Sequence, residues 1–467
     1  MSGDLNPNTP YSRSGVKRTG PVPPVGTGLL TARAGSGLAL FALVVALVII
    51  APVMALVAVS GQPGSMMEGA TDGGTWSHLL QTVLPTYALT SVLLVTGVCL
   101  LVLLMGVGTA WMVAAWEFPG RSMLEVGLIL PLAMPAFVMA YAYTEALDTS
   151  GLVQTTLRSW SGWDVGEYWF PQVRSLPGAA LFLALALYPY VYMLARNAFA
   201  ERNPNIADAA RSLGLSPVRV WWSVTWPVAR PAIAAGIALV TMETLADFGT
   251  VSFFAVDTFS AGIYRAWQSM GDRVTAAQLA LILLVVVIVL VRLERRQRGR
   301  MAFHARGQRP AQRAELRGTR AVLATLACAL PVFLGFVLPT GLLLRSWWMD
   351  GASVDARLLQ WMTHTGLLSG LAVIITVPGA LAVAYALRLS SARWLNAAAG
   401  VSGSGYAIPG VVMGVGLLAV IAAWDNGPGH WSGLLLGGSA FAVVYAYCAR
   451  FFAVAQQGLE ASLKRIS

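Results

Sequence analysis

Charged residues are scarce in this chain of 467 residues. Asp, Glu, Lys and Arg make up 11% of it, hydrophobic residues make up 57%, and the mean hydropathy is +0.66. A soluble domain carries about 25% charged residues, so the composition excludes a soluble globular protein. Apolar runs of about 18 residues or more recur along the whole length, as in transmembrane helices. The sequence therefore predicts an all-α polytopic membrane protein.

Residues that commonly bind metals or carry out catalysis are also few. The three cysteines, Cys99, Cys328 and Cys448, lie in separate apolar runs without the spacing of a disulfide framework or a metal knuckle. The four histidines are scattered, and no cluster of Tyr, His and carboxylates has ligand spacing. The two lysines, Lys17 and Lys464, do not follow a glycine-rich loop, so there is no phosphate-binding motif. We expect no catalytic residues, metal site or bound cofactor, and we expect any ATP hydrolysis to occur in a separate subunit.

The apolar runs divide into ten expected membrane spans. Residues 1–35 before them are rich in Pro, Gly, Ser and Thr and have no early apolar core, so we expect a disordered cytoplasmic tail rather than a cleaved leader. The expected spans are 37–59, 87–116, 124–147, 177–198, 231–254, 276–293, 321–346, 364–388, 397–424 and 433–455.

Basic residues are distributed unevenly between the two sides that these spans define. With the N-terminus inside, 25 Lys and Arg residues lie on the cytoplasmic side and six lie outside. Because basic residues favour cytoplasmic loops, we expect the N-terminus to be cytoplasmic. Ten arginines occur from Arg292 to Arg320. We interpret residues 294–320 as a basic cytoplasmic linker near anionic membrane lipid, rather than as a segment that binds nucleic acid.

Weak internal repeats occur on either side of this linker. The run "LAMPAFVMAYAY" is similar to "YAIPGVVMGVGL", with Pro135 matching Pro409. The run "YPYVYMLARNAF" is similar to "VYAYCARFFAV", and each places an arginine where we expect the chain to leave the membrane. Repeats in the same order predict two pseudo-symmetric transmembrane helix bundles, a first half over 36–293 and a second over 321–467.

The polar stretch 199–230 lies between two apolar runs and predicts a pair of short cytoplasmic helices. Gly214 stands where a helix ends in a left-handed residue, and Ser216 and Pro217 suit the start of a second helix. We expect Pro227 to end that second helix. Three tryptophans give it an apolar flank that can rest against the bilayer or the bundle.

This stretch resembles the EAA loop of ABC-importer permeases, whose pattern is Glu-Ala-Ala, three residues, Gly, nine residues, Ile, one residue and Leu-Pro. Every spacing holds in this sequence, with Asp in place of Glu, Val in place of Ile and Trp in place of Leu. The resemblance implies the type I importer permease fold and an ATPase-coupling loop that docks on an ATPase subunit. The matching residues are Asp208, Ala209, Ala210, Gly214, Val224, Trp226 and Pro227.

The run "METLADFGTVSFFAVDTFSAGIYRAW" is similar to the corresponding segment of ferric-iron ABC permeases with two fused halves. This resemblance implies a bacterial inner-membrane permease that is not itself an enzyme. It implies a periplasmic or extracytoplasmic ferric-binding protein and cytosolic ABC ATPase subunits, expected as a homodimer that uses ATP and Mg. Thiamine, sulfate, polyamine and phosphonate importers remain alternatives, as does an ion-coupled secondary transporter.

Two acidic residues lie within the expected span 231–254. Glu243 and Asp247 are four residues apart and should share a helical face, about 18 and 24 Å from the start of the span at 1.5 Å per residue. Acids at that depth cost on the order of 2.5 kcal/mol or more each, so they should face the bundle interior or water. They either line a cation path or form structural hydrogen bonds. In an ion-coupled transporter they would be the coupling site.

The second half is expected to be incomplete. If the halves repeat fully, a second coupling loop should follow Arg450. Alignment of Arg202 with Arg465 places the second acidic-Ala-Ala motif beyond Ser467. We therefore expect about six spans in the first half, about four in the second and twelve in a complete chain.

Overall fold

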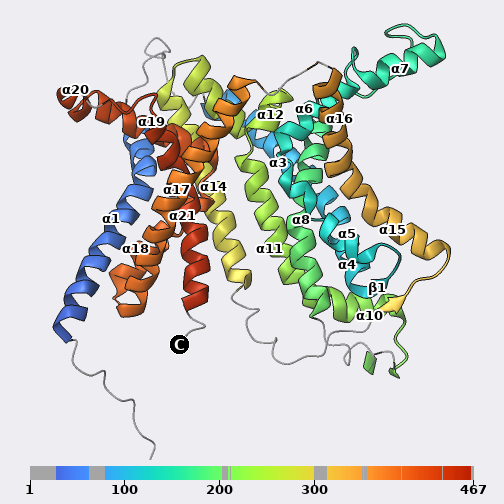
Figure 1. Ribbon diagram of the computed structural model, residues 1–467, viewed down its shortest axis with the longest axis horizontal. Helices are drawn as coiled ribbons and strands as arrows, with labels where there is room; N and C mark the ends of the chain where they lie inside the picture. The colour runs from blue at the N-terminus through green and yellow to red at the C-terminus, as the bar shows by residue number, and fades with distance from the viewer. Residues whose placement is uncertain are drawn as a thin grey trace, which may run out of the picture.

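The computed structural model of the chain is almost entirely helical (Figure 1). Within the described residues the only strands are β1 (Trp116–Glu117) and β2 (Ala314–Glu315), which pair in parallel. The expected all-α class is therefore confirmed. The structure describes residues 28–62, 79–201, 209–210, 212–298, 313–349, 351, 355–390, 392–433 and 435–463.

Seven helices are long and apolar enough to cross a membrane, and two bent helix pairs bring this number to nine in the described part of the chain. They correspond to nine of the ten expected spans. The tenth expected span, 433–455, coincides with α21 (Ala440–Leu463), a helix that contains Arg450 and falls outside this set. The seven unbent spans are Gly37–Ser60, Gln81–Ala115, Leu176–Ala200, Val218–Ala246, Arg273–Glu294, Thr319–Met349 and Ala356–Leu389.

The two bent pairs turn at the prolines that the sequence repeat matches. One pair surrounds Pro135 and is bent by 90°, and the other surrounds Pro409 and is bent by 115°. A short 3-10 turn precedes each proline, η3 (Leu130–Ala133) in one case and η7 (Gly405–Ala407) in the other. The backbone angles are nearly equal, with φ −57° and ψ 135° at Pro135 and φ −55° and ψ 142° at Pro409. Proline fixes φ and suits the position before a helix, so the repeated sequence forms the same bend twice.

Buried side chains form two separate cores. Large aromatic side chains of α8 lie at the centre of the first core, where Tyr188, Tyr192 and Phe199 are almost completely buried. The first core is built mainly from α3 (Leu84–Val102), η2 (Leu103–Val107), α4 (Gly108–Ala115), α5 (Arg121–Gly127), α6 (Ala136–Leu147), α8 (Leu176–Ala200), α11 (Trp226–Ala246), α12 (Gly249–Phe253), α15 (Thr319–Val332), η6 (Phe333–Val337) and α16 (Leu338–Met349).

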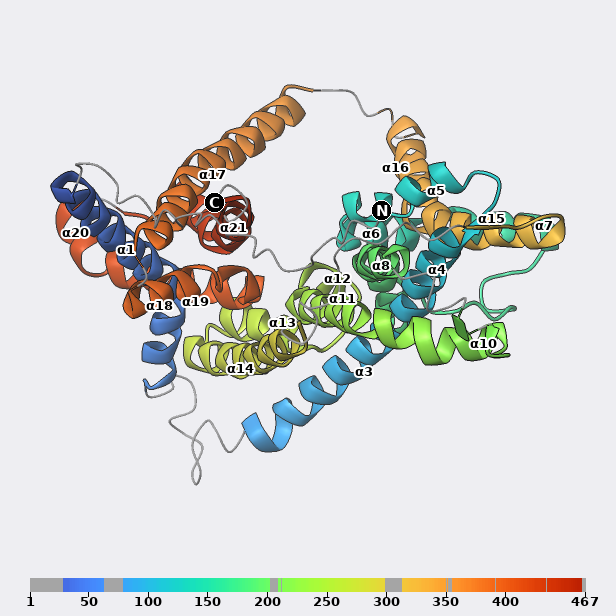
Figure 2. The same cartoon turned by 90° about the horizontal axis from the view of Figure 1, so that it is seen from below.

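The second core lies beside the first, and the two views in Figures 1 and 2 separate them. It is built mainly from α1 (Gly28–Ser60), α13 (Phe259–Tyr264), η5 (Arg265–Ser269), α14 (Arg273–Arg298), α17 (Ala356–Leu389), α18 (Arg393–Ser402), α19 (Gly410–Asp425) and α21. Short elements outside the cores are η1 (Leu79–Val83), α7 (Leu152–Ser161), α10 (Pro217–Val220), η4 (Trp221–Thr225) and α20 (Pro428–Ser432).

Each core contains helices from both halves of the sequence. The first helix, α1, packs against α17, α18 and α19 of the second core, and Gly416 permits this approach because a Cβ there would lie 2.5 Å from the Pro52 carbonyl oxygen. Conversely, α15 and α16 pack against the first core, where the Tyr143 hydroxyl donates to the Leu334 carbonyl at 2.6 Å. Each half of the sequence is therefore held by a helix from the other.

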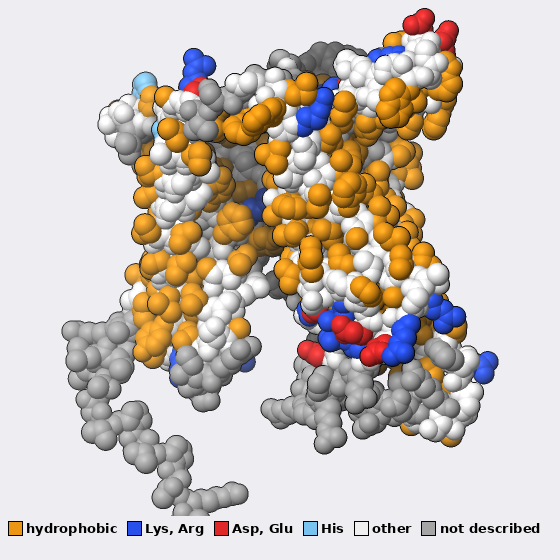
Figure 3. All heavy atoms as spheres, turned by 45° about the vertical axis from the view of Figure 1, so that its right-hand side comes forward, with side chains coloured by type: hydrophobic (Ala, Val, Ile, Leu, Met, Phe, Trp, Pro, Cys, Tyr) orange, Lys and Arg blue, Asp and Glu red, His pale blue; other side chains and the backbone are white. Residues whose placement is uncertain are grey.

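The outer surface has the polarity expected of a multi-pass membrane protein. Figure 3 shows hydrophobic side chains over the flanks of the helices and charged side chains mostly at their ends. Side chains such as Leu104 and Ile374 are 74% and 69% exposed. Below, the two ends of the bundle are named after the short helices that they carry in Figure 1, the α10 end and the α7 end.

Candidate functional site

The segment around Gly214 ends one helix and begins another, as the sequence predicts. Asp208 lies outside the described residues, whereas Ala209 and Ala210 are helical. The Leu215 N–H donates to the Ala210 carbonyl at 3.1 Å, and Gly214 has φ +83°. In this Schellman arrangement a left-handed residue closes the end of a helix. A Cβ at position 214 would meet no atom within 4 Å, so the positive φ, not crowding, favours glycine.

The second helix does not end at Pro227, and that prediction is wrong. Helix α10, the π turn η4 and α11 continue into one span, Val218–Ala246, and Val224 lies within the π turn. The Trp226 N–H bonds to the Trp221 carbonyl, so the hydrogen-bond register changes there. Pro227 then occupies the first turn of α11, where a missing N–H breaks no obligatory bond. Helix α10, η4 and α11 thus form one continuous helical element that joins the turn at Gly214 to the membrane span.

One side of this segment is anchored in the first core and the other side is exposed. The Trp221 ring lies 6.3 Å from the ring of Trp111 in α4 and 5.5 Å from that of Trp226, measured between centroids. On the other side, Leu213 is 84% exposed and Val218 is 68% exposed. A partner that binds these apolar side chains would therefore contact an element that is packed against the first core.

A charged cluster at the same α10 end joins α5 to α8. The buried Arg121 donates from Nη2 to Glu125 Oε2 at 2.7 Å and from Nε to the Val113 carbonyl at 2.9 Å. Arg196 of α8 pairs with the same carboxylate, and the Tyr192 hydroxyl donates to the Glu125 carbonyl at 2.9 Å. Hydrogen bonds to charged groups contribute about 1.5–3 kcal/mol each, so this cluster stiffens the first core next to α10.

Asp247 does not share a helical face with Glu243, contrary to the sequence prediction. Helix α11 ends at Ala246, and Asp247 has an extended conformation with ψ 128°. Its Oδ1 accepts hydrogen bonds from the N–H groups of Thr250 and Val251 at 3.0 and 3.1 Å, and its Oδ2 accepts one from the Thr250 hydroxyl. Asp247 thus caps the N-terminus of α12, because aspartate oxygens satisfy the free N–H groups of a first helical turn.

Glu243 links the two cores. Its Oε1 accepts a hydrogen bond from the Tyr406 hydroxyl at 2.8 Å, and its Oε2 lies 3.7 Å from Nη2 of Arg450. The Arg450 guanidinium also lies 5.8 Å from the centroid of the Tyr406 ring. Glu243 belongs to α11, which packs in the first core and also against α14 of the second, whereas Tyr406 in η7 and Arg450 in α21 belong to the second core. We call these three residues the inter-core bridge.

Neither partner of Glu243 in the bridge is predicted from the sequence. Tyr406 begins one copy of the internal repeat, and Arg450 lies in another repeated run, where the sequence predicts the edge of the membrane. In the structure Arg450 lies near the middle of α21. The repeats are thus a signal for the right segments, but no spacing in the sequence connects them to Glu243.

A cavity of about 310 Å³ lies beside the bridge. Pro135 and apolar side chains of α8 form part of its wall, and its polar lining contains Glu243, Asp247, Tyr190 and Arg450. Two carboxylates face one guanidinium, so the formal charge of the lining is negative. Among the described residues no group of three or more His, Cys, Asp and Glu side chains has the geometry to hold a metal ion. The side chains of Glu243, Asp247 and Tyr190 place oxygen atoms in the lining of this cavity.

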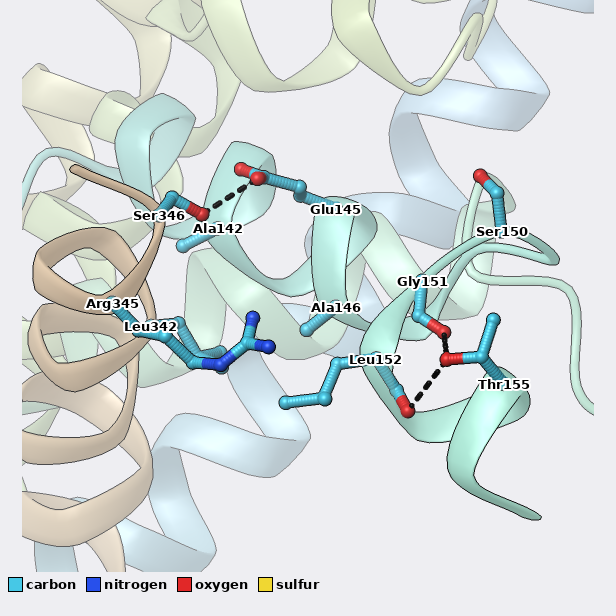
Figure 4. Close-up of a pocket in the computed structure, with 10 residues that line it drawn as sticks. All are labelled: Ala142, Glu145, Ala146, Ser150, Gly151, Leu152, Thr155, Leu342, Arg345 and Ser346. Carbon is cyan, nitrogen blue, oxygen red and sulfur yellow. Dashed lines mark hydrogen bonds between the residues drawn. The ribbon is translucent and has the colours of Figure 1, made fainter. Parts of the chain in front are cut away.

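A second recess of about 310 Å³ lies at the α7 end, between α6, α7 and α16. Glu145 accepts a hydrogen bond from the Ser346 hydroxyl at 2.6 Å on one side of it. Figure 4 shows the guanidinium of Arg345 extending from α16 toward Ala146 and Leu152. This recess has one charge of each sign and is separate from the bridge.

Comparison with known proteins connects these features to a family. Residues 103–301 match the family described as "Binding-protein-dependent transport system inner membrane component". Over these residues the chain is similar to this family of permeases. The matched region contains the segment around Gly214 and both Glu243 and Asp247, whereas Tyr406 and Arg450 lie outside it.

Curated proteins that are similar to this chain carry different substrates in their names. The Fe(3+)-transport system permease protein FbpB 2 of Haemophilus influenzae is 24% identical over 383 residues, which are 79% of this chain and 69% of the relative. The molybdenum transport system permease protein ModB of Escherichia coli is 28% identical over 183 residues, 38% of this chain and 77% of the relative. The sulfate transport system permease protein CysT of Salmonella typhimurium is 27% identical over 150 residues, 32% of this chain and 51% of the relative.

Proposed function

We propose that this permease is the membrane-spanning subunit of an ATP-driven importer and that the segment from Asp208 to Pro227 receives the force from a separate ATPase. The observation that carries the proposal is the exposed Leu213 beside a left-handed Gly214, in the turn that precedes α10, a helix that continues into a membrane span. The α10 end is then cytoplasmic, which agrees with the excess of basic residues expected on that side. ATP and Mg are bound by the partner subunits, expected as a homodimer, and not by this chain.

The proposed transmission runs along one helix. Trp226 and Glu243 are both in α11, and their separation along the axis is about 25 Å at 1.5 Å per residue. A push at Gly214 would therefore pass through residues 215–216 and then along α10, η4 and α11 to the inter-core bridge. The bridge is one contact between the two cores, beside the packing of α11 on α14. Its breakage would favour movement of the cores as rigid bodies, a common form of switching between two states.

We propose that the cavity beside the bridge lies on the substrate path and that Glu243 and Asp247 are its acidic lining. Glu243 would exchange its Tyr406 and Arg450 partners for the substrate during passage. Asp247 has a second, structural role as the cap of α12. Both interpretations of these acids from the sequence therefore have support, since Asp247 also lines the cavity.

For the substrate we propose ferric iron, delivered by a separate extracytoplasmic binding protein. Carboxylate oxygens suit hard cations, and the negative lining of the cavity favours a cation over molybdate or sulfate. The extent of similarity to the Fe(3+)-transport permease, 79% of this chain, supports the same choice. Uptake of labelled ferric iron that exceeds uptake of labelled molybdate and sulfate would support it, and the reverse order would contradict it.

Co-purification with the ATPase tests the docking role. The permease is co-expressed with its ATPase as the wild type, as Gly214→Asp and as Gly271→Asp. Gly271 is a matched control because it also has a positive φ, +67°, and a Cβ added there would meet no atom within 4 Å, but it precedes α14 and not α10. We expect wild type and Gly271→Asp to retain the ATPase and Gly214→Asp to lose it. Equal retention by both variants would contradict docking at Gly214.

A further inference from the structure

Helix α7 at the α7 end turns its polar side toward its own loop. Gln154 donates from Nε2 to the Leu147 carbonyl at 2.9 Å and accepts from the Tyr168 hydroxyl at 2.7 Å. Arg158 donates to the Tyr168 hydroxyl at 2.9 Å and to the Thr149 carbonyl at 2.7 Å. These bonds fix the helix against the residues that precede it, Leu147 and Thr149, and against Tyr168 in the loop that follows it.

The apolar side of α7 is left exposed. Leu152, Val153 and Trp160 are 37%, 41% and 85% exposed. At about 100° per residue these three positions fall within about 100° of one another, opposite Gln154 and Arg158. The helix is therefore amphipathic in the inverted sense, with polar groups inside and apolar groups outside.

Exposed aromatic side chains continue on both sides of this face. In the loop after α7, Trp163 is 47% exposed and Trp169 is 86% exposed, and in the last turn of the neighbouring α16, Trp348 is 82% exposed. Tryptophan is enriched where a membrane protein meets the headgroup region, because its ring is apolar and its N–H is polar. The aromatic side chains thus extend from a membrane-spanning element, α16, to α7.

The position of α7 fits the boundary of a bilayer. In Figure 1 it extends sideways from the end of the bundle, beyond α6 and α16. Figure 3 shows acidic side chains at the outer tip of this corner and hydrophobic side chains below them, and the acidic residues of the loop are Asp164 and Glu167. A helix of this kind lies in the plane of the interface with its apolar face in lipid.

We propose that α7 is an interfacial anchor, bound to the lipid of the leaflet at the α7 end through Val153 and Trp160, while Leu152 lies between this face and the second recess (Figure 4). The partner is lipid because α7 lines one recess with α16, a membrane-crossing element whose last turn also carries an exposed tryptophan, Trp348. The anchor has a consequence for the second recess. Gly151, Leu152 and Thr155 line it, so lipid binding fixes one wall of that recess relative to the bilayer.

Lipid-borne quenchers test the anchor in the full chain. In a background without Cys99, Cys328 and Cys448, an environment-sensitive fluorophore is attached at Val153→Cys or, as a control, at Thr155→Cys. Thr155 is also exposed and lies about 160° around the helix from Val153. Both proteins are placed in nanodiscs that contain lipids with a doxyl group near the headgroup. Because an interfacial helix buries its apolar face about 5–10 Å deep, we expect at least about two-fold stronger quenching at Val153→Cys.

A second variant separates anchoring from general effects of the label. Trp160→Asp, combined with the label at Val153→Cys, should lower lipid quenching to the level of the Thr155 control and should raise quenching by aqueous iodide. Equal lipid quenching at the two positions in otherwise native protein would overturn the proposal. So would protection from iodide that appears only when the soluble substrate-binding protein is added, because that result would assign the face to a protein partner.

Discussion

Removal of the charge at Glu243 should shift the equilibrium between a closed state, in which the two cores are in contact as in the structure, and an open state, in which they have moved apart. In the structure Glu243 accepts a hydrogen bond from Tyr406 and faces Arg450 at 3.7 Å, and both partners are in the second core. Glu243→Gln keeps the size of the side chain but removes the charge that both partners meet. Arg450→Met removes the opposite charge and keeps much of the apolar stem. Each change should therefore weaken one of the contacts between the cores and leave the packing of α11 on α14 in place.

The size of the shift follows from the exposure of the pair. Breaking a fully buried ion pair costs about 3–5 kcal/mol, and an exposed pair contributes about 0–1 kcal/mol. The side chains of Glu243 and Arg450 are 21% and 29% exposed, so an intermediate value of about 1–3 kcal/mol is expected. At 1.4 kcal/mol per factor of ten, the ratio of open to closed cores should rise about 5- to 150-fold.

Spin-label distances measure this ratio. Labels are attached in a cysteine-free background at Val218→Cys, next to the first core, and at Gly458→Cys in α21, where an added Cβ would meet no atom within 4 Å. Pulsed electron spin resonance then gives the populations of short and long distances. The control is Ser402→Ala, which breaks a buried hydrogen bond to Gln456 within the second core.

The expected result is a larger long-distance population in Glu243→Gln and Arg450→Met than in wild type or Ser402→Ala. If the distance distributions of all four proteins coincide, the bridge does not control the cores and the reasoning fails. If Ser402→Ala changes the distance distribution as much as Glu243→Gln and Arg450→Met do, the change reflects a general loss of stability and not the loss of the bridge.

Three further predictions concern packing and capping. Gly416→Val should lower the melting temperature in detergent, because overpacking against α1 costs about 1–3 kcal/mol, whereas Gly414→Val, with open space around its Cβ, should not. Equal melting temperatures would contradict the close approach of α1. Asp247→Ala should lose about 0.5–2 kcal/mol of stability with its cap, while Asp247→Asn should keep stability but lose uptake. Normal uptake by the Asn variant would show that Asp247 only caps α12 and has no role in the substrate path. Tyr143→Phe should lose about 1 kcal/mol with the hydrogen bond to Leu334, and unchanged thermal stability would show that this bond does not hold η6.

Local features of the fold could be predicted from the sequence. The spans follow from apolar runs longer than a bilayer is thick, and the left-handed Gly214 follows from its place after a helical pattern. The matching bends at Pro135 and Pro409 follow from the chemistry of proline in a repeated run. Each of these depends on neighbours in the chain and needs no knowledge of distant contacts.

The wrong predictions concern places where helices join. The lack of an N–H at Pro227 predicts the end of a helix, but a π turn supplies a new helical register before it. The spacing of Glu243 and Asp247 predicts one face of a continuous helix, but α11 ends between them. Both outcomes depend on tertiary packing that outweighs local propensity.

The contacts between cores could not be predicted, because they are long-range. Tyr406 and Arg450 are more than a hundred residues from Glu243 in the sequence, and nothing in their spacing marks the contact. Arg450 lies near the middle of α21, and only the contact with Glu243 shows what its charge meets there. The packing of α1 on the second core and of α15 on the first likewise has no signature in one sequence.

Uptake driven by ATP tests the central claim most directly. The permease and its ATPase are reconstituted in liposomes. Ferric iron and the binding protein are placed on one side of the membrane, and ATP is placed on the other side, with the ATPase. We expect uptake that requires ATP, that persists in Gly271→Asp and that is lost in Gly214→Asp. Uptake that follows an ion gradient without ATP, and that Gly214→Asp retains, would contradict the account and indicate an ion-coupled transporter.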